Sequence, residues 1–219
     1  MTVGQVQKLE LYYATGACSL VPHVALEEAG AAFQATRVDL ASGEQRSEAY
    51  RLINPLGRVP ALAVDGEVIS ENIAILTYIA HQFPESGVLP LQWPLALGRA
   101  YELMSWLAST AHVTIAQIWR TERFTDDAEA AVALQRDGRV HVAAHFATIE
   151  QKIAGEWVLG HRFSVLDPYL LVFWRWGERL GMDMSAYPRW ADLVQRTKAR
   201  PTVARVLERE TLAQETAGR

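Results

Sequence analysis

Hydrophobic and polar residues alternate near the amino terminus and predict a first strand. Leu9, Leu11 and Tyr13 alternate with more polar neighbours, which is the period of two expected of a strand with one buried face. A helix is predicted next, because Ser19 is a suitable N-cap and Gly30 is a suitable residue for a helix end.

The pattern continues with short elements up to residue 82. We expect a strand over 33–39, a short helix over 47–53, strands over 60–64 and 67–69, and a helix over 71–82 capped by Ser70. A strand–helix–strand unit followed by a helix, a hairpin and a last helix indicates a small mixed sheet with helices packed on it. The predicted fold of this part is therefore α/β.

Beyond residue 95 the period changes to that of helices, and we find no strand pattern. Three prolines and a glycine within 84–94 indicate a linker. Helical periodicity then covers 97–119, 127–153, 165–180, 188–198 and 201–208. We therefore expect an α/β domain over residues 8–84, a linker over 85–95 and an all-helical domain over 96–219.

Charge and composition exclude several classes of partner. The 219 residues include 21 lysines and arginines against 25 aspartates and glutamates, for a net charge of −4. A protein that binds nucleic acid or an anionic membrane typically carries a basic excess instead. No stretch approaches the ~20 apolar residues of a membrane span, and residues 1–7 lack the basic and apolar segments of a secretory signal. We therefore expect a cytoplasmic protein that binds neither nucleic acid nor membrane.

The chain has a single cysteine, Cys18, which excludes an internal disulfide and a cysteine-based metal cage. His141 and His145 have the i, i+4 spacing of metal ligands, but no third ligand accompanies them, so a solvated helix face is the better interpretation. We expect no metal site.

Cys18 is the first candidate for chemistry, because it lies between the first predicted strand and the first predicted helix. Unpaired N–H groups and the positive end of the helix dipole lower the pKa of a thiol in such a position. A small, buried, apolar cysteine is the alternative. Residue 21 is Val21, so the segment is not a Cys-x-x-Cys pair and dithiol chemistry by this chain alone is not expected.

Two further segments could bind a short peptide. The Val59–Pro60 bond enters a predicted strand, and a cis bond there would leave the backbone of Val59 open to pair with an extended peptide; an ordinary edge-strand proline is the alternative. Glu71 and Asn72 open a predicted helix, where backbone N–H groups bind a carboxylate and an acidic side chain pairs with an ammonium. An ordinary helix start with an acidic first turn is the alternative there.

Together these segments resemble the motifs of the bacterial beta-class glutathione S-transferases. The resemblance covers residues 12–23 (Tyr-Tyr-Ala-Thr-Gly-Ala-Cys-Ser-Leu-Val-Pro-His), 38–40, 54–62 and 70–75, and it extends through the linker and the helical half. It implies a thioredoxin-like domain followed by an all-α domain in a homodimer. It also implies glutathione as co-substrate and a role in detoxification.

The resemblance assigns roles to individual residues. It implies that glutathione contacts Ala17, Cys18, Arg58, Val59, Pro60, Glu71 and Asn72. It implies that Cys18 and His112 are catalytic. We expect the pocket for the second, apolar substrate to be lined by Tyr13, His112, Ile115, Ala116 and Trp119. Family members often bind glutathione through a lysine after the second strand, and residues 41–44 of this chain (Ala-Ser-Gly-Glu) lack one.

Three functions remain open. The first is conjugation of glutathione to small apolar electrophiles, in which Tyr12, Tyr13 or Ser19 are rivals to Cys18 for activating the sulfur. A glutathione-dependent thiol–disulfide reductase that uses Cys18 is the second. A non-catalytic binding or regulatory protein on the same fold is the third. Ser164 and Asp167 resemble a capping box of structural importance.

Overall fold

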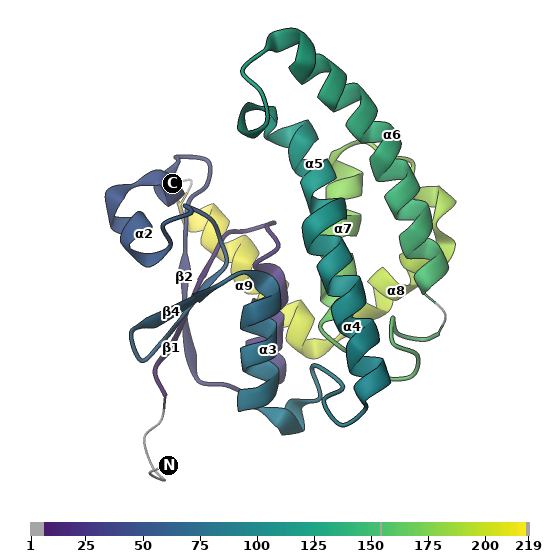
Figure 1. The fold of residues 1–219 in the computed structure, drawn as a ribbon. Coiled ribbons are helices and arrows are strands. Elements are labelled where there is room, and N and C mark those ends of the chain that lie inside the picture. Colours follow the sequence, from purple (N-terminus) through teal and green to yellow (C-terminus); the bar gives the residue numbers. More distant parts are fainter. Residues whose placement is uncertain (1–6, 154, 218–219) are drawn as a thin grey trace.

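The computed structural model of the chain describes residues 7–153 and 155–217, and the side chains among them up to residue 213. A four-stranded sheet in the order β2-β1-β3-β4 forms the first half (Figure 1). Its strands are β1 (Leu9–Tyr13), β2 (Phe33–Arg37), β3 (Ala61–Val64) and β4 (Glu67–Ser70). β1 is parallel to β2 and antiparallel to β3, and β3 is antiparallel to β4. The mixed sheet of a thioredoxin-like domain is thus confirmed.

The two faces of the sheet are covered by different helices, as the alternation along β1 requires. Leu11 and Tyr13 point to the side that carries α1 (Leu20–Glu28) and α3 (Asn72–Gln82), and both side chains are buried. Tyr12 points to the other face, where its ring lies 6.1 Å from that of Tyr50 on α2 (Glu48–Ile53).

The second half of the described chain is helical, as expected. It contains α4 (Pro94–Trp106), α5 (His112–Trp119), α6 (Ala128–Lys152), α7 (Leu166–Arg179), α8 (Pro188–Ala199) and α9 (Pro201–Ala217). The single helix predicted over 97–119 is wrong in one respect: a π-helical turn, η3 (Leu107–Ala111), separates α4 from α5. None of the helices in the described ranges combines the length and apolar character needed to cross a bilayer.

Two predicted helix caps are wrong. Ser70 is the last residue of β4, and Glu71, with φ 72°, makes the turn into α3 without a side-chain cap. The hydroxyl of Ser19 does not cap α1 either. It accepts a hydrogen bond from the Ala14 N–H (3.0 Å) and donates one to the Ala14 carbonyl (3.2 Å), which closes the loop between β1 and α1.

The capping box at the start of α7 is confirmed. The Asp167 carboxylate accepts hydrogen bonds from the Ser164 N–H (2.7 Å) and the Val158 N–H (2.9 Å). In return, the Ser164 hydroxyl accepts one from the Leu166 N–H (3.3 Å). Asp167 is fully buried, and burial raises the pKa of its carboxyl group to about 6.

The last helix returns to the first half of the chain. α9 packs against α1, where Arg200 forms a bidentate ion pair with Glu28 (2.7 and 2.8 Å) and Glu210 meets the buried His23 at 3.1 Å. The predicted boundaries at 84 and 96 stay predictions, and the structure adds that α4 already begins at Pro94. Residues 1–6, which belong to the segment searched for a secretory signal, lie outside the described residues. So do residues 154 and 218–219 of the predicted helical domain.

Candidate active site

Cys18 lies in the loop before α1 and is almost fully enclosed. Only 8% of the residue is exposed. The thiol points at the Val59 carbonyl, and the distance from the Cys18 Sγ atom to the Val59 oxygen is 3.8 Å. Burial raises the pKa of the thiol to about 12, and the charge of Glu71 acts in the same direction. The expectation of a lowered pKa is therefore wrong, because desolvation outweighs the hydrogen bonds that the backbone and Asn72 supply.

The bond between Val59 and Pro60 is cis, which is one of the two alternatives that the sequence left open. The preceding carbonyl, that of Arg58, accepts hydrogen bonds from the Tyr50 hydroxyl and the Asn54 amide, both at 2.8 Å. These bonds fix the backbone just before Val59. The Val59 N–H has no hydrogen-bond partner within the described part of the chain, so an extended peptide could pair with it.

The start of α3 lies on the other side of Cys18. The Asn72 amide donates a hydrogen bond to the Cys18 carbonyl (3.2 Å), while its Oδ1 atom is buried without a partner among the described residues. Glu71 is exposed and has a left-handed backbone conformation. Non-glycine residues in this conformation are often held there at binding sites. The exposed acidic side chain of Glu71 near Cys18 is a group that a free ammonium end could meet.

His112 is linked to the Cys18 loop through an aromatic cluster. The ring of His112 lies 4.7 Å from that of Trp176, which donates a hydrogen bond to the Gly16 carbonyl (2.9 Å). Trp119 extends the cluster, with its ring 5.9 Å from that of Trp176. Burial lowers the pKa of His112 to about 4, and the charges of Arg123 and Arg58 add to the effect. The imidazole is therefore neutral near pH 7 and can donate or accept one hydrogen bond.

The predicted pocket residues do not all reach this cluster. Tyr13 is only 3% exposed, and its ring packs on His23 at 4.8 Å, on the side facing α9. Ile115 is 1% exposed. Both belong to the core and offer almost no surface to a ligand, whereas Ala116 and Trp119 are half-buried.

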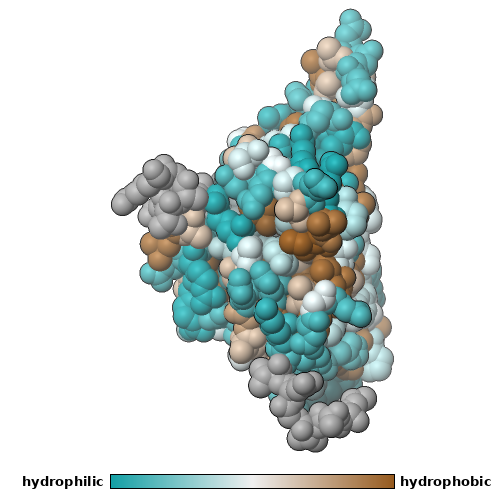
Figure 2. Space-filling model, turned by 90° about the vertical axis from the view of Figure 1, so that its left-hand side faces the viewer, coloured by the Kyte–Doolittle hydropathy of each residue, from teal (hydrophilic) through white to brown (hydrophobic). Residues whose placement is uncertain are grey.

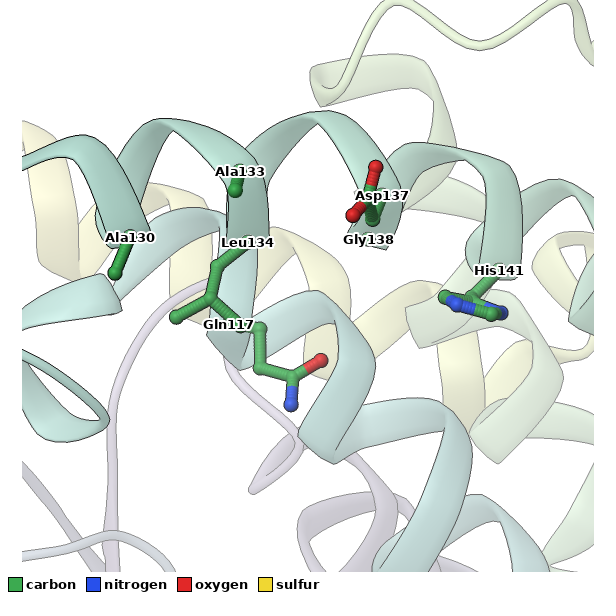
Figure 3. Close-up of a pocket in the computed structure, with 7 residues that line it drawn as sticks. All are labelled: Gln117, Ala130, Ala133, Leu134, Asp137, Gly138 and His141. Carbon is green, nitrogen blue, oxygen red and sulfur yellow. The ribbon is translucent and has the colours of Figure 1, made fainter.

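A hollow on the surface of the helical half lies away from this cluster. The hollow has a volume of about 430 Å³ and runs between α5 and α6, with Gln117 facing residues of α6 (Figure 3). Its lining consists of Gln117, Ala130, Ala133, Leu134, Asp137, Gly138 and His141. It contains none of the candidate site residues, so it is not the predicted substrate pocket.

Three residues near the site escaped the sequence analysis. Tyr169 of α7 is fully buried, and burial, with the Cys18 thiol nearby, raises the pKa of its phenol. Arg120 and Arg123 follow α5, and Arg123 acts electrostatically on His112. No local motif identifies any of them, because only the packing of the second half against the first brings them near the site.

The comparisons with known proteins agree with this geometry. The family model of the glutathione S-transferase N-terminal domain matches residues 7–81. A glutathione S-transferase of Xanthomonas campestris is 30% identical over 208 residues, which are 93% of this chain and 100% of the relative.

Two solved structures are also similar. A glutathione transferase homologue from Sulfitobacter with bound glutathione has a TM-score of 0.89 and 36% identity, with 94% of this chain and 99% of that one covered. A bacterial beta-class enzyme of Sphingomonas chungbukensis has a TM-score of 0.78 and 37% identity, with 92% and 98% covered. With these relatives and the Cys18, Val59 and Glu71 arrangement, the chain belongs to the glutathione S-transferase family and is a glutathione transferase enzyme.

Proposed function

We propose that this enzyme conjugates glutathione to small electrophiles of low polarity, as a beta-class transferase. The observation that carries the proposal is the unpaired N–H of Val59, a residue whose carbonyl faces the Cys18 thiol, while Glu71 acts electrostatically on the same thiol. The cysteinyl backbone of glutathione would pair with Val59, and its ammonium group would meet Glu71. The carboxylate of the same γ-glutamyl end would lie at the start of α3, where helix N–H groups are open.

The glutathione sulfur would then lie beside Cys18 and His112. A thiolate there is stabilised by the backbone N–H groups around Cys18 and by the positive field of Arg58 and Arg123. The neutral His112 ring and the half-buried Trp119 would contact the electrophile and hold it within attack distance. Cys18 itself would position glutathione, because its buried thiol is protonated near neutral pH.

Calorimetric titration with glutathione tests the proposed site. Replacement of the exposed acid by Glu71→Gln should weaken binding about tenfold, because an ionic hydrogen bond is lost. The matched control is Glu67→Gln, which removes the same charge from an exposed position on β4 and should leave the affinity unchanged. Equal affinities for wild type and Glu71→Gln would contradict the proposed orientation of glutathione.

A glutathione-dependent thiol–disulfide reductase is the second candidate, because the Cys18 sulfur lies within reach of the same backbone edge. The two functions separate in a Cys18→Ala variant. Conjugation of 1-chloro-2,4-dinitrobenzene should persist in this variant, whereas a reductase would lose its disulfide exchange entirely. Loss of both activities with intact glutathione binding would make Cys18 itself the essential group.

We further propose a cytoplasmic homodimer. Leu52 and Leu56, on and after α2, are 84% and 63% exposed, and Val68 on the edge strand β4 is 40% exposed. The face of the molecule shown in Figure 2 carries a brown hydrophobic patch surrounded by hydrophilic residues. Exposed apolar surface of this kind favours a second protein surface. Sedimentation of the purified chain measures its oligomeric state.

A further inference from the structure

Four arginines gather at the site without an acidic partner. Arg46 and Arg58 lie on either side of α2, Arg120 directly follows α5, and Arg123 ends the η4 turn (Thr121–Arg123). None of these guanidinium groups forms an ion pair or a hydrogen bond among the described residues. Other arginines of the chain do, such as Arg200 with Glu28.

The four charges act on one another across the two halves of the chain. Burial lowers the pKa of Arg123, and the charges of Arg58, Arg120 and Arg46 lower it further, while Glu122 opposes them. His112 also lies in the field of Arg123 and Arg58. In Figure 1 the teal turn that follows α5 projects toward the side of the molecule that carries α2. Arg58 and Arg123 therefore approach His112 from different halves.

An aromatic surface adjoins these charges. It begins at the Gly16 carbonyl, which accepts the indole N–H of Trp176, and continues to Trp119. A further guanidinium, that of Arg179, lies over the Trp119 ring with its Cζ 5.1 Å from the ring centre. Trp119 is half-buried and so retains surface for a ligand. A flat apolar group would pack here with its acidic substituent directed at the arginines.

We propose that the second substrate of this transferase is an electrophile that carries a carboxylate, and that Arg123 with Arg120 binds this group. The inference rests on the proposed function and modifies its substrate class, because the electrophile would combine an apolar aromatic body with one ionised acidic group. Arg120 and Arg123 are both exposed, so solvent screens part of the repulsion between their charges, and a bound carboxylate would relieve the rest. Guanidinium groups also bind carboxylates through paired, charge-assisted hydrogen bonds. Arg58 adjoins Val59, so in this arrangement it would bind the glycine carboxylate of glutathione and not the second substrate.

The test uses an aromatic acid and its neutral ester. With 4-chloro-3,5-dinitrobenzoate, the glutathione sulfur forms a bond to the carbon that bears chlorine. The carbon–chlorine bond breaks, chloride leaves with the bonding pair, and the thiol proton passes to solvent, so nothing is oxidised or reduced. The methyl ester undergoes the same reaction without the charge. The ratio of kcat/KM for the acid to kcat/KM for the ester therefore reports on the carboxylate alone.

Arg123→Gln should lower this ratio about 10- to 100-fold, because a charged hydrogen bond to the substrate is lost. The KM for glutathione should stay as it is in the wild type. Arg136→Gln is the control: it removes the same charge from an exposed residue of α6 that pairs with Asp137, and it should leave the ratio unchanged.

Two results would overturn the inference. An unchanged ratio in Arg123→Gln would show that no carboxylate of the second substrate is bound there. A raised KM for glutathione with an unchanged ratio would assign Arg123 to the glycine carboxylate instead. If the wild type conjugates neither the acid nor the ester, the result contradicts the proposed conjugation of these two compounds and leaves the carboxylate site to be tested by binding. Calorimetry with unreactive 3,5-dinitrobenzoate and its methyl ester still tests the site: equal affinities for acid and ester would refute it, and a preference for the acid that Arg123→Gln removes would support it.

Discussion

The thiol of Cys18 should react very slowly with alkylating reagents near neutral pH. Its pKa is raised from an ordinary value of about 9 to about 12, chiefly by burial. Since the thiolate is the reactive form, a rise of this size lowers the reactive fraction near pH 7 about a thousandfold. Only 8% of the residue is exposed, and limited access slows the reaction further.

The assay is the rate of iodoacetamide labelling of the reduced protein, followed by mass spectrometry from about pH 6 to about pH 10. A free thiol such as glutathione, in the same buffers, supplies the reference rate. We expect the rate for Cys18 to rise steadily through this range without reaching a plateau. The rate must be compared with and without denaturant, since unfolding removes the burial that raises the pKa.

A different result would refute the reasoning. Rapid labelling with a plateau below about pH 8 would show that the helix terminus and the backbone hydrogen bonds outweigh desolvation. Cys18 would then be an activated thiolate, and the thiol–disulfide reductase would become the leading function. Slow labelling in the folded state and fast labelling in denaturant support a positioning role for Cys18.

Three further outcomes are expected. Asp167→Ala should lower the free energy of unfolding by about 2–5 kcal/mol in denaturant titrations, because two buried N–H groups lose their acceptor; a loss below about 0.5 kcal/mol would contradict this. The imidazole resonances of His112 should titrate near pH 4, and a midpoint near pH 6.5 would show that the ring is solvated. Leu56→Glu should shift the sedimenting species from dimer to monomer, whereas Val140→Glu, at an exposed apolar position on α6, should not.

Local signals predicted the backbone of the site well. The alternation around Leu11 identified β1, and the turn before Val59 made a cis bond one of two alternatives, because both features depend on residues close together in the sequence. The same signals misjudged the Cys18 thiol. A helix terminus can be recognised from the sequence, but the burial that dominates the pKa is created by contacts with distant segments such as that around Val59.

Side-chain environments were harder to predict than elements. The period of two placed Tyr13 on the buried face of β1, but it could not show that the covering group is His23 rather than an open pocket. The arginines after α5 were missed for a related reason. Arg123 has the same local pattern as any exposed arginine, and only its approach to His112 and Arg58 distinguishes it.

The π-helical turn η3 has a consequence for the orientation of α5. Each residue of an α-helix turns the chain by about 100°, and a π-turn accommodates one residue more than an α-turn does. If the same residues, Leu107–Ala111, formed an α-helix instead, the extra residue would rotate everything after it by about that angle. His112 and Trp119 would then leave the aromatic cluster around Trp176 together. The wide turn thus sets the rotational register of α5, and a variant that loses one residue of the turn together with its π-helical geometry should keep His112 and Trp119 in the cluster.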